Sequence, residues 1–192
     1  MNRQIMWSRW QGTGLEHLRL FSIQAGVVAD SVVLGVQEQQ PFRVNYEIHC
    51  TSDWSLRAVR VNVLSDTSQS LSLLTDGAGN WTTQDGEAVP LLEGCLDVDL
   101  SITPFTNTLP IRRLALQPGM TAVLPMAYIA LPHMQVEVTQ QRYTCLDSTS
   151  SAGRYLFESL ENGVSSFTAE LPVDQYSLVM DYPELFRRTG EW

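Results

Sequence analysis

Apolar and polar residues alternate with a period of two along much of the chain. In Phe42–Cys50, positions 42, 44, 46, 48 and 50 are apolar, and the four positions between them are polar. Because successive side chains of a strand lie on opposite faces, this alternation predicts a half-buried strand. Cys95–Thr103 alternates in the same way, with apolar residues at 96, 98, 100 and 102, and is predicted to be a second strand.

Seven further segments show a rougher alternation and are predicted to be strands. They are Leu18–Ile23, Val59–Leu64, Val123–Leu131, Met134–Val138, Tyr155–Leu160, Phe167–Val173 and Ser177–Tyr182. Segments rich in Gly, Asn, Asp or Pro lie between several of them, at 76–80, 84–86, 118–119 and 161–163. Short strands joined by short turns predict an antiparallel meander, and Pro125 and Pro132 favour a sheet edge for the apolar run between them. We therefore predict a mainly β protein.

Two segments predict helical structure instead. Asn107 and Thr108 are N-cap residue types and Pro110 suits the first turn, so a short helix is predicted over Asn107–Leu114. Asp181–Arg188 is predicted to form a second helical turn, because a proline and a glutamate come early in it and two arginines come late.

Length and composition indicate one globular domain, residues 1–192. The net charge of −9 disfavours nucleic acid and anionic membrane surfaces as partners. The start of the chain has no secretory pattern and no segment approaches the length of a membrane span, so a cytoplasmic protein without stable membrane insertion is expected. Three widely spaced cysteines, Cys50, Cys95 and Cys145, are expected to be reduced and mostly buried.

The densest polar cluster lies between positions 94 and 113. Asp97 and Asp99 are two residues apart on a predicted strand, so they project from the same face, and Arg112 and Arg113 are the nearest cations in the sequence. Two interpretations are open. The carboxylates form a site that hydrogen-bonds sugar hydroxyls or supplies an acid and a base, or they form an ion-pair network that ties the helix to its strand.

This segment carries a resemblance to a known family. GCLDVDLS at 94–101, followed by Thr103-Pro104 and TNTLPIRRL at 106–114, resembles the signature of the putative glycolipid-binding protein family. Further matches include Trp10, GLEH at 14–17, Tyr46 with Cys50 and Trp54, Gly79 with Trp81, QRY at 141–143, FTAEL at 167–171 and DYP at 181–183. The resemblance implies a spiral β-roll, in which a large antiparallel sheet is curled around one short central helix, and a homodimer. The implied fold is distantly similar to bacterial lipoprotein localisation factors.

The candidate ligand-binding residues follow from the cluster and the resemblance together: Asp97, Asp99, Asn107, Thr108, Arg112, Arg113, His17, Trp10 and Tyr143. His17 is either an oriented base beside Glu16 or a hydrogen-bonded structural residue, and a tryptophan can stack on a sugar or pack in the core. No catalytic residue is assigned. The three histidines form no HxH or HxxxH pair and no phosphate loop or nucleotide fingerprint is present, so we predict no metal and no cofactor.

Three hypotheses about function remain. The first is a binding protein that holds a glycolipid or similar amphiphile in an apolar interior or cleft. The second is a hydrolase that uses the Asp97 and Asp99 pair, and the third is a structural or regulatory dimer without a ligand. The directions of the Asp97 and Arg112 side chains discriminate between them, because mutual burial favours a structural network and exposure in a pocket favours a ligand site.

Overall fold

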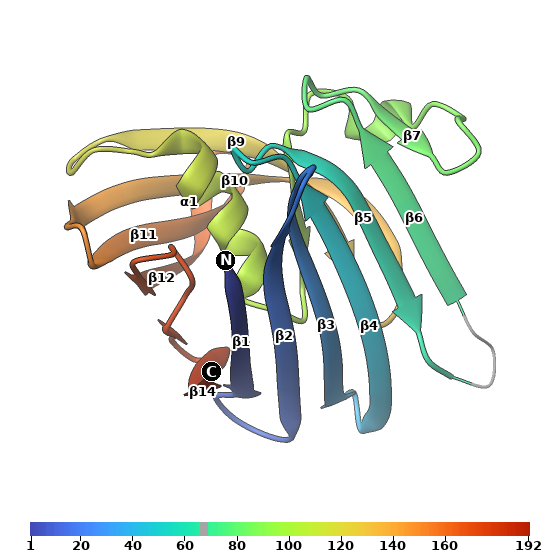
Figure 1. Ribbon diagram of the computed structural model, residues 1–192, viewed down its shortest axis with the longest axis horizontal. Helices are drawn as coiled ribbons and strands as arrows, with labels where there is room; N and C mark the ends of the chain where they lie inside the picture. The colour runs from blue at the N-terminus through green and yellow to red at the C-terminus, as the bar shows by residue number, and fades with distance from the viewer. Residues whose placement is uncertain (66–68) are drawn as a thin grey trace.

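The computed structural model describes residues 1–65 and 69–192, and its strands form two sheets (Figure 1). The strands are β1 (Asn2–Arg9), β2 (Gly14–Ile23), β3 (Gly26–Gln37), β4 (Gln40–Cys50), β5 (Leu56–Val63), β6 (Gln69–Thr75), β7 (Trp81–Thr83), β8 (Asp97–Leu100), β9 (Thr121–Ala130), β10 (Gln135–Ser148), β11 (Ala152–Glu161), β12 (Val164–Asp174), β13 (Asp181–Tyr182) and β14 (Phe186–Glu191). The larger sheet has the order β13-β14-β1-β2-β3-β4-β5-β6-β7, and the smaller has the order β12-β11-β10-β9-β8.

The protein is mainly β, as predicted, and almost every neighbouring pair of strands is antiparallel. The alternation at 42–50 lies in β4, and the predicted strands at 18–23, 59–64, 123–131, 134–138, 155–160 and 167–173 coincide with or overlap β2, β5, β9, β10, β11 and β12. The predicted turns fall between strands. Asn162 and Gly163, for example, have φ values of 52° and 79° in the tight connection of β11 to β12.

One parallel pair in the smaller sheet is an exception to the antiparallel pairing. β8 pairs with β9 through Asp97–Leu100 and Met126–Ile129. The strand is shorter than the predicted Cys95–Thr103, because the chain turns after Leu100 and the Thr103 amide donates to the Leu100 carbonyl. Parallel neighbours need a crossover connection, and this crossover contains the helix.

β9 pairs with β8 on one side and with β10 on the other, so it is not an edge strand where β8 runs beside it. The sequence had favoured a sheet edge for the run between Pro125 and Pro132. At Pro125, however, β9 is hydrogen-bonded to β10 alone, because the β8 ladder begins one residue later. The proline therefore lies at a position where its missing N–H removes no bond to β8.

Within residues 1–65 and 69–192 there is one α-helix, α1 (Thr108–Leu114), which follows a 3₁₀ turn, η2 (Phe105–Asn107). The predicted N-cap role of Asn107 is wrong, because the chain is already helical there and its side chain makes no cap hydrogen bond. Leu109 packs in the core of the larger sheet and Ile111 in the core beneath the smaller one. In Figure 1 the helix lies between the blue strands of the larger sheet and the yellow-to-red strands of the smaller, which confirms the predicted central helix.

The predicted helical turn at Asp181–Arg188 is wrong. The segment forms β13, a tight turn and the start of β14, with Glu184 at a φ of 67° and the Leu185 amide donating to the Tyr182 carbonyl. β14 also pairs along β1, so its backbone groups are bonded to a strand at the other end of the chain. Pairing at this sequence separation overrides the local helical signal.

The three cysteines are free and buried, as predicted. Among the described residues, no helix is long and apolar enough to cross a membrane.

Candidate functional site: a cavity with one aromatic and one polar side

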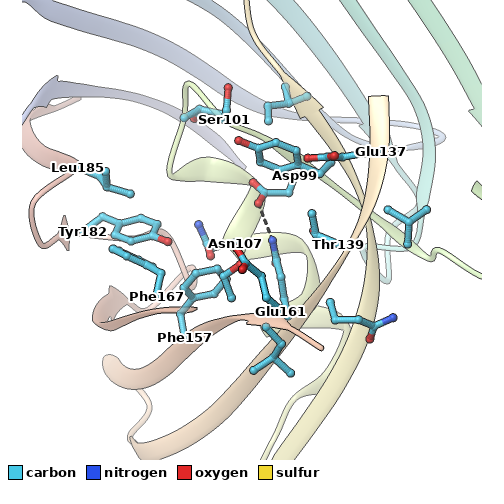
Figure 2. Close-up of a pocket in the computed structure, with 18 of the residues that line it drawn as sticks. Asp99, Ser101, Asn107, Glu137, Thr139, Phe157, Glu161, Phe167, Tyr182 and Leu185 are labelled. Atoms are coloured by element: carbon cyan, nitrogen blue, oxygen red, sulfur yellow. Dashed lines mark hydrogen bonds between the residues drawn. The ribbon is translucent and has the colours of Figure 1, made fainter. Parts of the chain in front are cut away.

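A cavity of about 680 Å³ opens where the inner face of the smaller sheet meets β13 and β14. Its lining comes from β8 to β12, from the C-terminal hairpin and from the segment before α1. Figure 2 shows Phe157, Phe167, Tyr182 and Leu185 on one side, and Asp99, Glu137 and Thr139 on the other. The cavity is therefore amphipathic in cross-section.

The aromatic side is a contiguous cluster of rings. Phe157 on β11 lies 5.8 Å from Tyr182 and 6.2 Å from Phe167, measured between ring centroids. Tyr182 in turn lies 6.1 Å from Phe167 and 6.2 Å from Phe186. The strand period brings these rings to one face, since Phe157 and Phe167 both project inward from neighbouring strands. The rings form a wall that can contact an acyl chain or the face of a sugar.

The polar side rests on a hydrogen-bonded network. Asp99 accepts hydrogen bonds from Thr106 Oγ1 at 3.0 Å and from Gln141 Nε2 at 2.6 Å. The Tyr143 hydroxyl lies 3.1 Å from Gln141 Oε1 and 2.9 Å from Asn107 Oδ1. Residues from β8, η2 and β10 are thereby joined at the base of the cavity.

Asp99 is a carboxylate that has no cation beside it in the described part of the chain. Burial raises its pKa above the ordinary value of 3.8, and the hydrogen bonds from Gln141 and Thr106 oppose this rise. Among the described residues that line the cavity, the ionisable acids are Asp99, Glu137 and Glu161, and none is Arg, Lys or His. The site therefore offers hydrogen-bond acceptors and negative charge to whatever enters it.

Asp97 does not share this cavity. Its side chain is fully buried, and Arg113 donates to it from Nε at 3.1 Å and from the terminal nitrogen at 2.5 Å. Burial raises the pKa of Asp97, and the hydrogen bonds and positive charge of Arg113 oppose this rise. The acidic cluster of the sequence is thus divided into an ion pair between β8 and α1 and a separate carboxylate, Asp99, that lines the cavity.

Arg112 and Thr108 fasten the helix to the segment between β12 and β13. Arg112 donates to the Tyr176 carbonyl at 2.9 Å, and its guanidinium lies 4.4 Å from the centre of the Trp54 ring. Thr108 donates to the Ser177 carbonyl at 3.0 Å. Neither side chain lines the cavity, so the structure places both in the support of α1.

The remaining candidates lie in three different places. Asn107 lines the cavity, and Tyr143 lies directly behind it. His17 is on the outer face of the larger sheet, where Nε2 is 2.9 Å from Gln4 Oε1. The ring of Trp10 is covered by the Arg187 guanidinium at 4.1 Å. Of the nine residues predicted from the sequence, Asp99 and Asn107 line the cavity and Tyr143 supports it.

Comparison with known proteins places this arrangement in a family. The family model described as putative glycolipid-binding matches residues 4–188. The chain belongs to this family. It is also similar to a crystal structure of a DUF1089 family protein from Pseudomonas aeruginosa, with 40% sequence identity, a TM-score of 0.83 and coverage of 94% of this chain and 95% of that one. No match is found among curated protein sequences.

Membership of the putative glycolipid-binding family confirms the resemblance first seen at 94–114. Within that motif, Asp97, Thr106, Asn107 and Arg113 all make the side-chain hydrogen bonds described above. The motif therefore acts in large part to hold α1 against β8, and Asp99 and Asn107 are its members that line the cavity.

Glu16 is a buried polar residue that the sequence analysis did not select. It is 2% exposed, and one oxygen accepts hydrogen bonds from Ser31 at 2.8 Å and Tyr46 at 2.5 Å, while Oε2 has no hydrogen-bond partner among the residues that the structure describes. Burial raises its pKa from 4.5 to about 7. A signal was present in the sequence, since Glu16 is in phase with the buried Leu18 and Leu20 on one strand.

The aromatic wall was not predicted either. Phe157 and Phe167 lie in strands that the pattern identifies. Tyr182 ends the predicted strand Ser177–Tyr182, of which only Asp181–Tyr182 is a strand in the structure, and Phe186 lies in the segment whose local signal favoured a helix. Only the pairing of β14 with β1 and β13 brings these two rings to the cavity.

Proposed function

We propose that this protein binds an amphiphile, a glycolipid or a similar molecule, in the cavity of about 680 Å³. The observation that carries the proposal is the division of the cavity into an aromatic side and a polar side (Figure 2). Pockets for small molecules have volumes of roughly 300–1,000 Å³ and combine apolar walls with a few polar groups that orient the ligand.

The polar side suits hydroxyl groups. Each carboxylate oxygen can accept two hydrogen bonds. Thr106 and Gln141 use one position on each oxygen of Asp99, which leaves acceptor capacity for a ligand. Sugar hydroxyls are donors that meet this need, and the rings opposite offer an apolar surface to a hydrocarbon chain. The family name supports the same ligand class.

Filling the cavity is expected to abolish binding. Ser159 lines it on β11 and pairs with Phe167 on β12. Ser159→Phe should weaken binding of decyl β-maltoside, used below its micelle concentration, by about tenfold or more, because the new ring occupies the space of the chain. Isothermal titration calorimetry measures the affinity, and maltose alone should bind far more weakly because it lacks the apolar tail.

The matched control is Thr168→Phe, which adds the same ring to an exposed outward position on β12. It should bind decyl maltoside as the unmodified protein does. Equal affinity of Ser159→Phe and Thr168→Phe would contradict a binding site in this cavity.

We also propose that the protein forms a homodimer through an apolar strip on the outer face of the larger sheet. Leu15, Val32, Leu34 and Val36 are each 40–45% exposed on neighbouring strands β2 and β3. A two-fold interface brings the same patch from both copies together, and exposed apolar side chains of this kind favour it.

Leu34→Glu is expected to convert the dimer to a monomer, because it places a charge in the centre of the strip. Light scattering coupled to size-exclusion chromatography measures the mass. Val164→Glu is the control, since Val164 is 70% exposed in a different part of the molecule. A monomeric mass for the unmodified protein would refute the dimer.

A further inference from the structure

A second hollow, of about 360 Å³, adjoins the amphiphile cavity. Ser101 and Tyr128 line both, so the two hollows meet at these residues. The second hollow is also lined by the end of β1, the β1–β2 turn and the end of β3, which contribute Arg9, Gln11, Thr13 and Gln37. Its lining therefore includes a cation and several groups able to hydrogen-bond.

Arg9 is a partly buried guanidinium without a counter-charge. Within residues 1–65 and 69–192, no carboxylate forms an ion pair with it, and its guanidinium makes no hydrogen bond. It lies 5.0 Å from the centre of the Phe186 ring, which lines the larger cavity. Burial without a partner lowers the pKa of Arg9. A partly desolvated cation with no anion beside it among the described residues is well placed to take an anionic group from a ligand.

The chain holds this side chain in place. A Cβ atom at Gly14 would lie 2.4 Å from Arg9 Cγ, so a glycine is needed across the strand pair for Arg9 to adopt its position. Glu16 lines a void of about 10 Å³ together with Arg9, but its carboxylate accepts from Ser31 and Tyr46 and forms no ion pair with Arg9. The guanidinium is therefore positioned by packing and remains available to a ligand.

We propose that Arg9 anchors an acidic group of the amphiphile, a phosphate, sulfate or carboxylate, in the hollow beside Ser101 and Tyr128. This inference rests on the proposed function and specifies its ligand class. An acidic group would be repelled from the main cavity by Asp99, Glu137 and Glu161, so the hollow at Arg9 is where a negative charge is accommodated. The hydroxyl-bearing part of the same ligand would then lie against Asp99, and its chain against the aromatic wall.

Titration of decyl phosphate and decyl β-maltoside into the unmodified protein tests this inference. Arg9→Gln is expected to weaken decyl phosphate binding by about tenfold or more, because charge-assisted hydrogen bonds are lost. Binding of decyl maltoside should change by less than about twofold, since it carries no charge. Added salt should weaken decyl phosphate binding to the unmodified protein and leave decyl maltoside unaffected.

Arg187→Gln is the matched control, because Arg187 also lies over an aromatic ring, that of Trp10, but lines neither hollow. Arg9→Lys keeps the charge and should retain part of the affinity, which guards against a folding defect in Arg9→Gln. Decyl phosphate binding that is equally strong in Arg9→Gln and Arg187→Gln would overturn the anion site while leaving the proposed function in place.

Inorganic phosphate separates a lipid headgroup from a free anion. It should bind at least about tenfold more weakly than decyl phosphate, because it makes no contact with the aromatic wall. Equal affinities would overturn the assignment of the anion to an amphiphile. Failure of the proposed function itself would give a different result. Decyl maltoside would then bind Ser159→Phe and the unmodified protein with equal affinity.

Discussion

Replacing Arg113 with methionine is expected to lower the free energy of unfolding by about 3–5 kcal/mol. Asp97 is fully buried, and both of its carboxylate oxygens accept hydrogen bonds from Arg113. Methionine fills the space of the arginine stem but leaves the carboxylate in a low-dielectric interior without a counter-charge. Urea denaturation at pH 7 measures the loss, which should be among the largest for any residue of the 94–114 motif.

A double variant separates a structural role from a ligand-binding one. Asp97→Leu with Arg113→Met replaces the ion pair by apolar groups, and it should recover most of the stability lost in the single variant. Decyl maltoside binding should be unchanged in the double variant, because Asp97 does not line the cavity. Loss of binding with full stability would instead identify the pair as part of the ligand site.

The control for this experiment is the pair of Arg142 and Glu158. Its side chains are 32% and 13% exposed, and Arg142 lies at 3.1 Å from the carboxylate. Arg142→Met should cost about 1 kcal/mol or less, because solvent screens a partly exposed pair. A cost equal to that of Arg113→Met would contradict the burial argument.

The stability of the protein is expected to fall as the pH rises from about 4.5 to about 7, through the titration of Glu16. The pKa of Glu16 is raised to about 7 in the folded protein by burial, against 4.5 as its ordinary value. Between these values the folded state keeps a proton that the unfolded state has released. Folding is therefore favoured at the acidic end, and this contribution, roughly 3 kcal/mol, is lost above pH 7.

Glu16→Gln isolates this contribution, because the amide oxygen can still accept from Ser31 and Tyr46 but the group no longer titrates. The difference in unfolding free energy between the variant and the unmodified protein should shift by roughly 2.5 kcal/mol in favour of the variant from pH 5 to pH 8. Denaturation curves at both pH values measure this shift. A constant difference across the range would show that the folded-state pKa of Glu16 is not raised.

Some strands were predictable from the chain because one face is buried and the other is not. In β4, inward Val44, Tyr46 and Ile48 alternate with polar residues, and the strand was located within two residues of its observed start. β3 was not singled out, because Val32, Leu34 and Val36 are exposed on its outer face while Val33 is buried on its inner face. A strand that is apolar on both faces loses the period that identifies it.

The site was predictable only in part. Asp99 and Asn107 belong to a motif that the sequence displays as a dense polar cluster, and both line the cavity. The same cluster suggested that Asp97 and Arg112 act there too, yet their side chains point to Arg113 and to the Tyr176 carbonyl. Which of several neighbouring polar residues lines a cavity depends on the path of the chain after β8, which local pattern does not specify.

The sequence by itself determined the fold class, the position of α1, the burial of the three cysteines and the family. These properties depend on local periodicity or on a contiguous motif, both of which can be read along the chain. Only the tertiary structure decided where the cavity lies, because its walls come from β8 to β12, from η2 and from a hairpin near the C-terminus. Which charged side chains form ion pairs was likewise decided by the tertiary structure alone. Among the described residues, Arg9 and Asp99 have no ion-pair partner because of where strand pairing between distant segments places the β1–β2 turn and β8.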